Sequence, residues 1–458
     1  MLREQLDLVT DYAGIGRLYE ASFADHVCYS NRPAAAAIFA GPSPSPAVNG
    51  WRTLVACDWT MGRSTAFAGV RALPAGRHVR LTQHHERPII TDHDPAERWV
   101  GRRAQRRDFA DLVEQGVAGL TSTMASVSAL WPQEVEVDLS GGRDSRAVAA
   151  AALASGIPVR FHTHDLVPGE LEMAARLLEL VDRPVHHRIE RIAHTGSGSA
   201  SPAPGVFEQS VAWHRYAEGV RPSSYLWQSP PADLTGRAGL VVGGAGGELA
   251  HEIYYTDDDL RNIGADNLAE WASALLQRRV IARGAVGQVA TKFTARRIEQ
   301  VVRKGLDAGF DDATVLDYFF IGERLRRWGM TGEWDGIVSP LLTPGFVDAA
   351  FALTPSERTD NRLIDEILTR LMPRWVGLPF VHGQPARPPR VRHVGLATDH
   401  ERVATLVNRP DEWQGLFSPR RIKSAWDASR QGASTATQEL GLRRLVWWAA
   451  FRELVEPL

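Results

Sequence analysis

Cysteine is scarce in this sequence. Cys28 and Cys57 are the two cysteines among 458 residues, and they have neither a CxxC nor another metal-ligand spacing. A chain of this length can bury a large core without disulfides. The fifteen histidines form no HExxH motif, and the adjacent pair His186-His187 is poorly spaced for one shared metal ion. The composition therefore excludes a disulfide scaffold and a cysteine-based zinc module, and we expect reduced thiols.

Strong net charge and long apolar runs are also missing. The formal net charge is −2, so no overall field favours nucleic acid or an anionic membrane. No run of eighteen apolar residues occurs, and the first residues, Met1-Leu-Arg-Glu-Gln5, carry no apolar secretory core. We therefore expect a cytoplasmic protein with no nucleic-acid or membrane partner. The hydrophobic content of 44% is ordinary for a globular chain of two or three domains.

One stretch carries a strong chemical pattern. A β-like run, Val135–Leu139, meets the turn Ser140-Gly141-Gly142, and a small-residue helix is predicted from Arg146 to about Gly156. Adjacent glycines let the backbone approach an anion, and a helix N-terminus presents free N–H groups and partial positive charge. Ser140 and Ser145 add hydroxyls. The carboxylate of Asp144 would repel a phosphate unless a divalent metal lies between them.

This loop is not a Walker A motif, because the sequence Gly-x-x-x-x-Gly-Lys-[Ser/Thr] is absent here. Its order, Ser-Gly-Gly-x-Asp-Ser, resembles the pyrophosphate loop of ATP pyrophosphatases, which release pyrophosphate and pass AMP to an acceptor. The alternative is an ordinary Gly-Gly turn between a strand and a helix. The match over this six-residue stretch, with five specified positions in a strand–turn–helix context, favours the pyrophosphate loop.

The chain around this loop divides into regions of different pattern. Residues 1 to about 100 alternate short β-like runs with Gly/Pro turns, which predicts a small, mostly antiparallel sheet with runs at Arg52–Cys57, Ala66–Leu73 and His78–Leu81. Apolar residues at helical spacing predict a long amphipathic helix from Arg103 to Leu130.

After the glycine loop, alternating strands and helices predict a parallel sheet with helices on its faces. The expected strands are 158–163, 185–189 and 240–242, with a helix at 170–180; helices dominate 257–378 and the last forty residues, and 195–205 and 383–393 are loops. Most of the fourteen tryptophans are expected in the core, with a peptide groove as the alternative place for those late in the chain.

A second glycine cluster, Gly243-Gly-Ala-Gly-Gly-Glu248, follows the expected strand at 240–242. Open parallel sheets bind ligands beyond the carboxyl ends of their strands, at a switch point. The two glycine turns can therefore face one another across a nucleotide, and Glu248 can complete a metal shell begun by Asp144. Taken alone, the second cluster is equally consistent with a flexible turn.

Three blocks together resemble the synthetase domain of the asparagine synthetase superfamily. They are Leu139-Ser-Gly-Gly-Arg-Asp-Ser145, Val241-Val-Gly-Gly-Ala-Gly-Gly-Glu248 and Ser339-Pro-Leu-Leu-Thr-Pro-Gly-Phe-Val347. The resemblance spans about residues 104–380. It implies an α/β fold with a parallel-sheet ATP-pyrophosphatase domain, resembling the adenine nucleotide alpha hydrolases, and it implies ATP and Mg²⁺ as substrate and cofactor.

The resemblance also assigns roles to individual residues. Ser140, Gly141, Gly142 and Ser145 would hold pyrophosphate, Asp144 and Glu248 would bind Mg²⁺, and Leu139, His164 and Gly244 would border the adenosine. Glu248 replaces the aspartate that is usual in the family.

Two further positions bear on catalysis. Glu323 lies where β-lactam synthetases have a glutamate near the acceptor amine, and a carboxylate there can orient the amine or take its proton. A surface salt bridge to Arg326 or Arg327 is the equally weighted alternative. Ala245 stands where asparagine synthetases place glutamate and β-lactam synthetases place tyrosine.

The lysine that the family has near the end of this domain is missing. No lysine occurs from Pro373 to Pro389. Arg374, Arg387 or Arg390 is the candidate to supply positive charge to the leaving pyrophosphate.

The resemblance also predicts the domain organisation. Residues 1–100 would be a truncated, non-catalytic, β-rich glutamine-amidotransferase-like domain, because Leu2 follows Met1 where glutamine-dependent members have a nucleophilic cysteine. Residues 104–393 would be the ATP-pyrophosphatase domain, and 394–458 a helical extension. The alternative for the first region is a start codon further upstream.

Without glutaminase, the enzyme would use an amine that its substrate already holds. The blocks around Glu323 and 339–347 look most like lasso peptide cyclases. That likeness implies an AMP-forming carbon–nitrogen ligase that adenylates an Asp or Glu side chain of a leaderless core peptide and closes an isopeptide macrolactam with the peptide's N-terminal amine. Its expected partners are a leader peptidase and a precursor-recognition protein. The alternatives are an ammonia-using amide ligase like asparagine synthetase, a β-lactam synthetase-like enzyme, and a catalytically idle nucleotide-binding scaffold.

Overall fold

The computed structural model describes residues 5–23, 26–41, 43–82, 88–105, 108–165, 167–191, 205–219, 240–282, 284–326, 336–381 and 392–456. Its centre is a five-stranded parallel sheet with the strand order β11 (Ile337–Val338), β10 (Val241–Val242), β7 (Val135–Asp138), β8 (Val159–His164) and β9 (His186–Glu190). The predicted α/β class with a parallel sheet is therefore confirmed, while the ATP-pyrophosphatase assignment stays a prediction.

Apolar residues that alternate along the strands give this sheet its buried face. Val137 of β7 pairs in register with Phe161 of β8, and both are fully buried. Helix α5 (Arg143–Ala154) contributes the run Ala149–Ala152 to the same core, with no exposed surface. Because alanine is small and a strong helix former, α5 can pack closely against its neighbours. Helix α6 (Glu170–Glu179) packs on β8.

The N-terminal part contains two small antiparallel sheets in addition to helices. One has the order β1 (Gln5–Val9), β5 (Arg77–Thr82), β6 (Ile89–Asp92), and the other β3 (His26–Ser30), β2 (Tyr19–Phe23), β4 (Val70–Ala72). The antiparallel pairing predicted for this region is confirmed, including strands within 66–73 and 78–81. The likeness of this part to a glutamine amidotransferase stays a prediction.

The strand predicted at Arg52–Cys57 is wrong. These residues belong to helix α2 (Val48–Cys57), which buries Trp51, Leu54 and Val55 on one side. A short apolar run cannot be assigned to strand or helix from periodicity alone. The three-to-four-residue spacing from Trp51 to Leu54 and Val55 was the helical feature in this run.

The long helix predicted at 103–130 is present but divided differently. Helix α3 (Pro95–Ala104) begins at its cap Asp94, whose Oδ1 accepts the Ala96 N–H at 3.0 Å, and helix α4 (Phe109–Leu130) follows. The remaining helices are α1 (Pro33–Ala40), α7 (Val206–Ala217), α8 (Asp257–Leu260), α9 (Leu268–Val280), α10 (Gln288–Asp307), α11 (Thr314–Phe319), a π-helix (Phe320–Leu325), α13 (Pro344–Ala352), α14 (Pro355–Thr359), α15 (Arg362–Leu371), α16 (His400–Val407), α17 (Pro419–Arg430) and α18 (Ala436–Val455). The loops predicted at 195–205 and 383–393 lie almost wholly outside the described residues.

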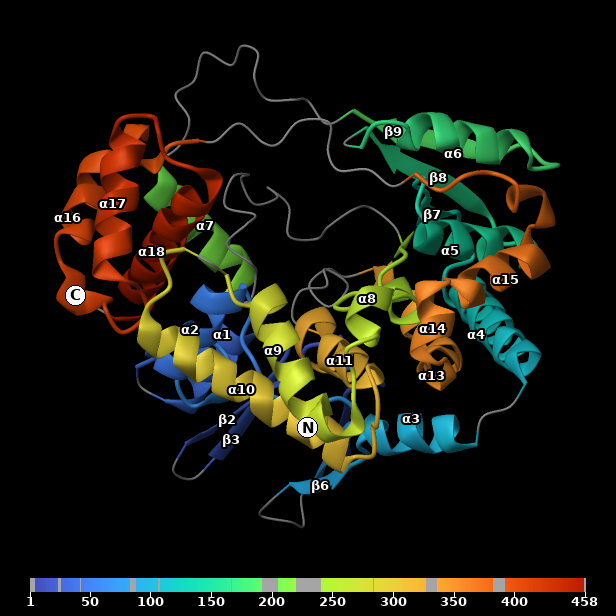
Figure 1. Cartoon of the computed structure of the whole chain (residues 1–458), viewed down its shortest axis with the longest axis horizontal. Helices are drawn as coiled ribbons and strands as arrows, with labels where there is room; N and C mark the ends of the chain where they lie inside the picture. Colours follow the sequence, from blue (N-terminus) through green and yellow to red (C-terminus); the bar gives the residue numbers. More distant parts are fainter. Residues whose placement is uncertain are drawn as a thin grey trace.

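Two hydrophobic cores organise these elements. In Figure 1 the strands β7, β8 and β9 lie on the right, and helices α16, α17 and α18 lie on the left. The sheet core joins the parallel sheet to α4, α5, α13 and α15. The aromatic core joins α2 and the β3-β2-β4 sheet to α7 and to the C-terminal helices α16, α17 and α18. The domain boundaries at 100 and 393 stay predictions. The first and last parts of the described chain share the aromatic core.

Most tryptophans in the described ranges fill these cores, as expected from the sequence. Trp51, Trp375, Trp413 and Trp447 are among the largest fully buried side chains. Among the described helices, none is both long enough and apolar enough to cross a membrane.

Candidate functional site

The parallel sheet reverses its direction of growth between β7 and β10. Along the chain, β8 and β9 are added on one side of β7, whereas β10 and β11 are added on its other side. In open parallel sheets, ligands bind beyond the carboxyl ends of the strands at such a switch point. The two glycine turns follow β7 and β10, so the sheet places both of them there.

The first glycine loop is held by its own serines. The two hydroxyls, Ser140 Oγ and Ser145 Oγ, lie 2.8 Å apart, and Ser145 Oγ accepts the Ser140 N–H at 3.1 Å. The Gly142 N–H donates to Ser140 Oγ over 3.1 Å, and Gly142 is the N-cap of α5. The loop is therefore fixed around a helix N-terminus, where free N–H groups attract an anion.

The second glycine loop packs directly on Asp144 of the first. A Cβ on Gly247 would lie 2.2 Å from Asp144 Cγ, and a Cβ on Gly244 would lie 2.8 Å from the Ser145 nitrogen. These distances are too short for any side chain, so glycine is required for the two loops to meet. The predicted convergence of both loops is therefore present in the structure.

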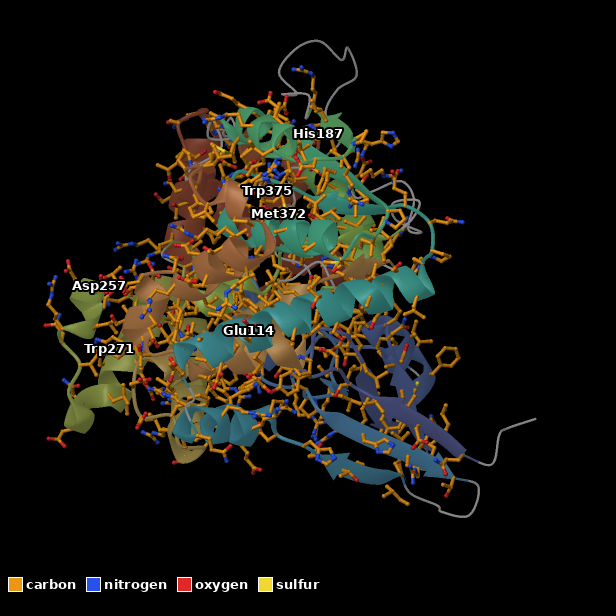
Figure 2. All side chains as sticks on the ribbon, turned by 90° about the vertical axis from the view of Figure 1, so that its right-hand side faces the viewer. Glu114, His187, Asp257, Trp271, Met372 and Trp375 are labelled. Atoms are coloured by element: carbon orange, nitrogen blue, oxygen red, sulfur yellow. The ribbon has the colours of Figure 1, made fainter. Side chains whose placement is uncertain are left out.

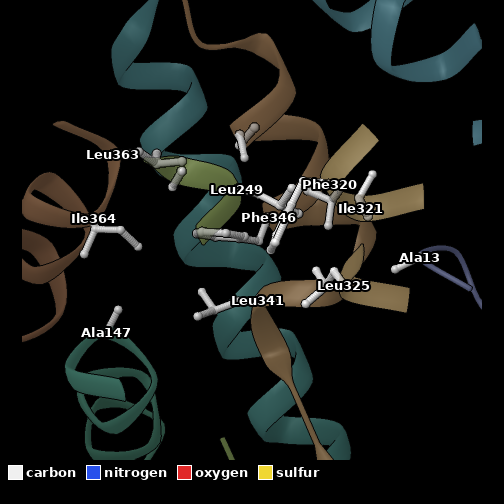
Figure 3. Packing of buried hydrophobic residues seen from close by; sticks show 14 of the residues in the cluster. Ala13, Ala147, Leu249, Phe320, Ile321, Leu325, Leu341, Phe346, Leu363 and Ile364 are labelled. Carbon is white, nitrogen blue, oxygen red and sulfur yellow. The ribbon is translucent and has the colours of Figure 1, made fainter. Parts of the chain in front are cut away.

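The third block closes on the second. The Gly243 N–H donates to the Val338 carbonyl at 3.0 Å, and a Cβ on Gly246, which has φ +97°, would lie 2.5 Å from Leu342 Cδ2. Behind the loops, one apolar cluster joins the three segments (Figure 3). It contains Ala147 of α5, Leu249 after the second glycine loop and Leu341 of the third block. The three blocks on which the family resemblance was based thus form one contiguous surface.

Acidic groups at this junction suit a divalent cation. Asp144 Oδ1 is buried and receives no hydrogen bond from any residue that the structure describes. Burial and the nearby Asp144 carboxylate raise the pKa of Glu248, whose Oε2 accepts the Gly246 N–H at 2.9 Å. Two carboxylates that destabilise one another's charge fit the ligand chemistry of Mg²⁺, which favours oxygen ligands.

His251 is a further charged neighbour that the sequence did not single out. Its Nε2 lies 3.7 Å from Asp144 Oδ2. Burial favours the neutral imidazole, but the interaction with Asp144 outweighs it and raises the pKa of His251. Three residues after Glu248, His251 brings a titratable imidazole to the same junction.

An arginine pair next to the loop was also missed. The Arg146 guanidinium has no exposed surface and donates to the carbonyls of Gly141, Leu378 and Pro379 at 3.1, 2.9 and 2.9 Å. Both Arg143 and Arg146 lie over the Phe380 ring, 4.3 Å from its centroid. Burial and the like charge of Arg143 lower the pKa of Arg146 to about 10. The segment 378–381 is thereby tied to the pyrophosphate loop.

The residues expected to border the adenosine lie on this edge in different ways. The Leu139 side chain is buried in the sheet core, and its carbonyl accepts from Thr163 Oγ1 at 2.6 Å. His164 ends β8, with its Nδ1 3.5 Å from Glu170 Oε2. Gly244 lies against Ser145 as described above. Their roles toward a nucleotide stay predictions.

Glu323 is held by the N-terminal part of the chain. It lies in the π-helix, is 7% exposed, and its Oε2 accepts the Gly62 N–H at 2.6 Å. Arg326, one of the two salt-bridge partners considered for it, donates through Nε to the Gly14 carbonyl at 3.1 Å. The other, Arg327, lies outside the described residues, as do Arg387 and Arg390. Arg374 forms an exposed ion pair with Asp182.

A polar cluster lies on the charged face of the sheet. His162 pairs in register with Asp138 of β7, and its Nδ1 lies 2.8 Å from Asp138 Oδ1. Its Nε2 lies 3.0 Å from Oε2 of Glu190, which is on the other neighbouring strand, β9. Glu136, Asp138 and His162 offer atoms within 4.8 Å of one another. Arg188 already donates twice to Glu136, at 2.8 and 2.9 Å. Alternate polar residues in 136–138 and 160–164 were the sequence pattern for this cluster.

Comparisons with known proteins add no family assignment. A scan of the chain against models of protein families finds no match, and a search of the curated proteins finds none. The class of protein is therefore inferred from the site and from the three motifs.

Proposed function

We propose that this chain is an ATP-dependent, AMP-forming carbon–nitrogen ligase. The observation that carries the proposal is the junction of three motif blocks at the switch point, where Asp144 lies between two glycine loops. An anion site at the N-terminus of α5, beside a half-buried carboxylate whose Oδ1 receives no hydrogen bond from the described residues, suits a metal-bound polyphosphate.

The reaction has two balanced steps. A carboxylate oxygen of the acceptor acid attacks the α-phosphorus of ATP, the bond to the bridging oxygen breaks, and pyrophosphate leaves with that electron pair. An amine then attacks the acyl carbon of the acyl-adenylate, AMP leaves, and the nitrogen loses a proton. The products are an amide, AMP and pyrophosphate.

The described residues support the first step through positioning. Ser140, Ser145 and the N–H groups at the start of α5 would bind the departing pyrophosphate, and Arg146 would keep the loop in place against 378–381. Mg²⁺ bound by Asp144 and Glu248 would neutralise charge on that leaving group. Leu139, His164 and Gly244 would border the adenosine.

The acceptor that we propose is a peptide, with the enzyme acting as a lasso peptide cyclase. Its substrate would be a leaderless core peptide, whose Asp or Glu side chain is adenylated and whose own N-terminal amine closes an isopeptide ring. A substrate fold that holds amine and acyl carbon together can supply about 7–11 kcal/mol of the barrier. Glu323, fixed by Gly62, would orient the amine or take its proton.

The decisive experiment is incubation of the purified chain with ATP, Mg²⁺ and candidate core peptides. We expect AMP, pyrophosphate and a peptide product lighter by one water, measured by chromatography and mass spectrometry. Asp144→Asn should abolish AMP formation while circular dichroism stays unchanged. The matched control is Asp182→Asn, which removes an exposed carboxylate far from the loops in sequence. A fully active Asp144→Asn enzyme contradicts the metal role, and absence of AMP with every peptide contradicts the cyclase.

Ala245 favours one competing function, a catalytically idle nucleotide-binding scaffold. Its methyl group replaces the functional side chains of the related synthetases, and the family's lysine is missing. ATP binding in equilibrium dialysis without pyrophosphate release would support the scaffold. Turnover that depends on aspartate and ammonia would instead indicate an asparagine synthetase-like ligase.

A further inference from the structure

A basic groove lies apart from the glycine loops. It is formed by α9, residues 281, 282 and 284–286, the start of α10, α17 and the start of α18, and has a volume of about 970 Å³. In Figure 1, α17 lies at the left, β7 and α5 lie on the right, and α9 and α10 lie between them; Figure 2 shows Trp271 of α9 near the molecular edge. None of its lining residues belongs to the three motif blocks.

The charged residues that line the groove, among those described, are all arginines. Arg278 lies on the α9 wall and Arg420 and Arg421 lie on the α17 wall, and none of the described residues that line the space between them is an aspartate or glutamate. Arg421 donates to the Gly284 carbonyl at 2.6 Å. Arg278 and Arg420 are exposed and form no ion pair or hydrogen bond with any residue in the described ranges. Two guanidinium groups are thus available to a ligand from outside.

The floor of the groove is fixed before any ligand arrives. The Ala282 N–H donates to the Ala56 carbonyl at 2.7 Å, and the Ser418 N–H donates to the Ala285 carbonyl at 2.8 Å. Helix α18 packs so closely that a Cβ on Gly441 would lie 2.5 Å from the Ala285 Cβ. A preformed floor avoids part of the ordering entropy that binding otherwise costs.

The lining combines these charges with apolar surface. Trp271 and Ile281 are half-exposed within the groove. Arginine forms bidentate hydrogen bonds with carboxylates, and an indole face accepts an aliphatic or aromatic side chain. The volume is at the upper end of the range for ligand sites, much larger than a single phosphate group needs.

We infer that this groove binds an acidic segment of a polypeptide, with carboxylates on the two arginine walls and an apolar side chain on Trp271. The opposite walls are suited to carboxylates spaced along one chain. Binding there needs neither ATP nor the glycine loops, so it stands apart from the reaction proposed above.

The test uses a fluorescein-labelled peptide of glutamates with leucines at intervals, titrated with the full chain and followed by fluorescence anisotropy. We expect saturable binding that weakens as salt rises. The double variant Arg278→Ala/Arg420→Ala should weaken binding at least about tenfold, since it removes the charged partners of the peptide carboxylates on both walls. The matched control, Arg176→Ala/Arg215→Ala, removes two exposed arginines from other helices and should leave affinity unchanged.

Further binding measurements distinguish binding in this groove from general attraction between opposite charges. Trp271→Ala should weaken binding of the leucine-containing peptide, but not binding of a peptide with glycine in place of leucine. The Asp144→Asn variant should bind the peptide with the affinity of the unaltered chain. The inference is overturned if binding is not saturable, if the control variant loses as much affinity as the groove variant, or if a single-stranded oligonucleotide or tripolyphosphate binds the groove more tightly than the peptide.

Discussion

Both cores of this protein contain large aromatic residues, but they differ in what lies beside them. The sheet core uses valine, leucine and the alanine run of α5, and its edge carries glycine loops whose backbones touch. In the aromatic core, the ring centroids of Trp448 and Phe451 lie 4.9 and 5.0 Å from the ring centroid of Trp51. Small residues allow the close backbone contacts that a phosphate site needs, whereas large rings fill space and hold helices together. We therefore expect damage to the first region to appear in catalysis and damage to the second in stability.

The largest expected effect tests the aromatic core. Trp51→Ala removes a fully buried indole whose N–H donates to the Ala66 carbonyl at 3.2 Å. It should lower the free energy of unfolding by about 3–5 kcal/mol, measured by urea titration. Trp131→Ala, at a tryptophan that is 41% exposed, is the control.

A matched change in the sheet core sharpens this comparison. Trp375 is equally buried and donates to the Leu177 carbonyl at 2.9 Å, but it precedes the segment that binds Arg146. Trp375→Ala should lower stability, and it should also lower AMP formation per folded molecule, which Trp51→Ala should not. Equal loss of activity in both variants would contradict the division of roles.

The next effect concerns the contact between the two loops. Gly247→Ala would push a methyl group onto Asp144, and a displacement of about 1 Å at a reacting centre can lower the rate about 10²-fold. We expect that loss in AMP formation. Gly101→Ala is the control, because a Cβ there meets no atom within 4 Å. Unchanged activity in Gly247→Ala would show that the loops need not touch.

A smaller effect is predicted from the buried imidazole of the aromatic core. Burial lowers the pKa of His214 from 6.5 to about 3, although its Nε2 hydrogen-bonds the Trp447 carbonyl. The unfolded chain therefore binds a proton that the folded chain excludes. This contribution to stability is full above pH 6.5 and is lost as pH falls toward 3, by up to ~1.4 kcal/mol per pH unit.

His214→Gln removes the contribution of this imidazole to the pH dependence of stability. The difference in urea midpoint between the two proteins should shrink as pH falls from neutral toward acid. His186→Gln, at an exposed histidine, should leave the pH dependence of the midpoint unaltered. A His214→Gln protein with the original pH dependence would contradict the assignment.

The smallest effect is expected at Arg374, a candidate for the missing lysine's role. Its ion pair with Asp182 is exposed, and exposed pairs contribute about 0–1 kcal/mol. Arg374→Ala should therefore change neither the urea midpoint nor AMP formation appreciably. A large loss of activity would instead assign Arg374 to the leaving pyrophosphate.

Local chemistry made the sheet and its first loop predictable. The run from Val135 to Leu139 and the glycines after it specify a strand and a turn within a few residues, and β8, α6 and β9 followed from the same alternation. Helix α2 was mistaken for a strand because its apolar residues also fit a short buried run.

Other parts of the site depend on contacts between distant segments. Arg146 binds carbonyls 232 and 233 residues further along the chain, and Glu323 meets Gly62, which precedes it by 261 residues. Neither pairing leaves a local pattern. The cluster around His162 arises from strand register, which alternation alone does not fix between two strands.

The position of α18 has a consequence for biosynthesis. Arg444 of this helix binds Asp58, 386 residues earlier in the chain, at 2.9 Å, while Trp448 and Phe451 pack on Trp51. During translation, α2 must leave the ribosome long before the partner that covers it has been made. Nascent chains would thus expose an apolar helix for most of their synthesis, and its folding would be completed after α18 emerges.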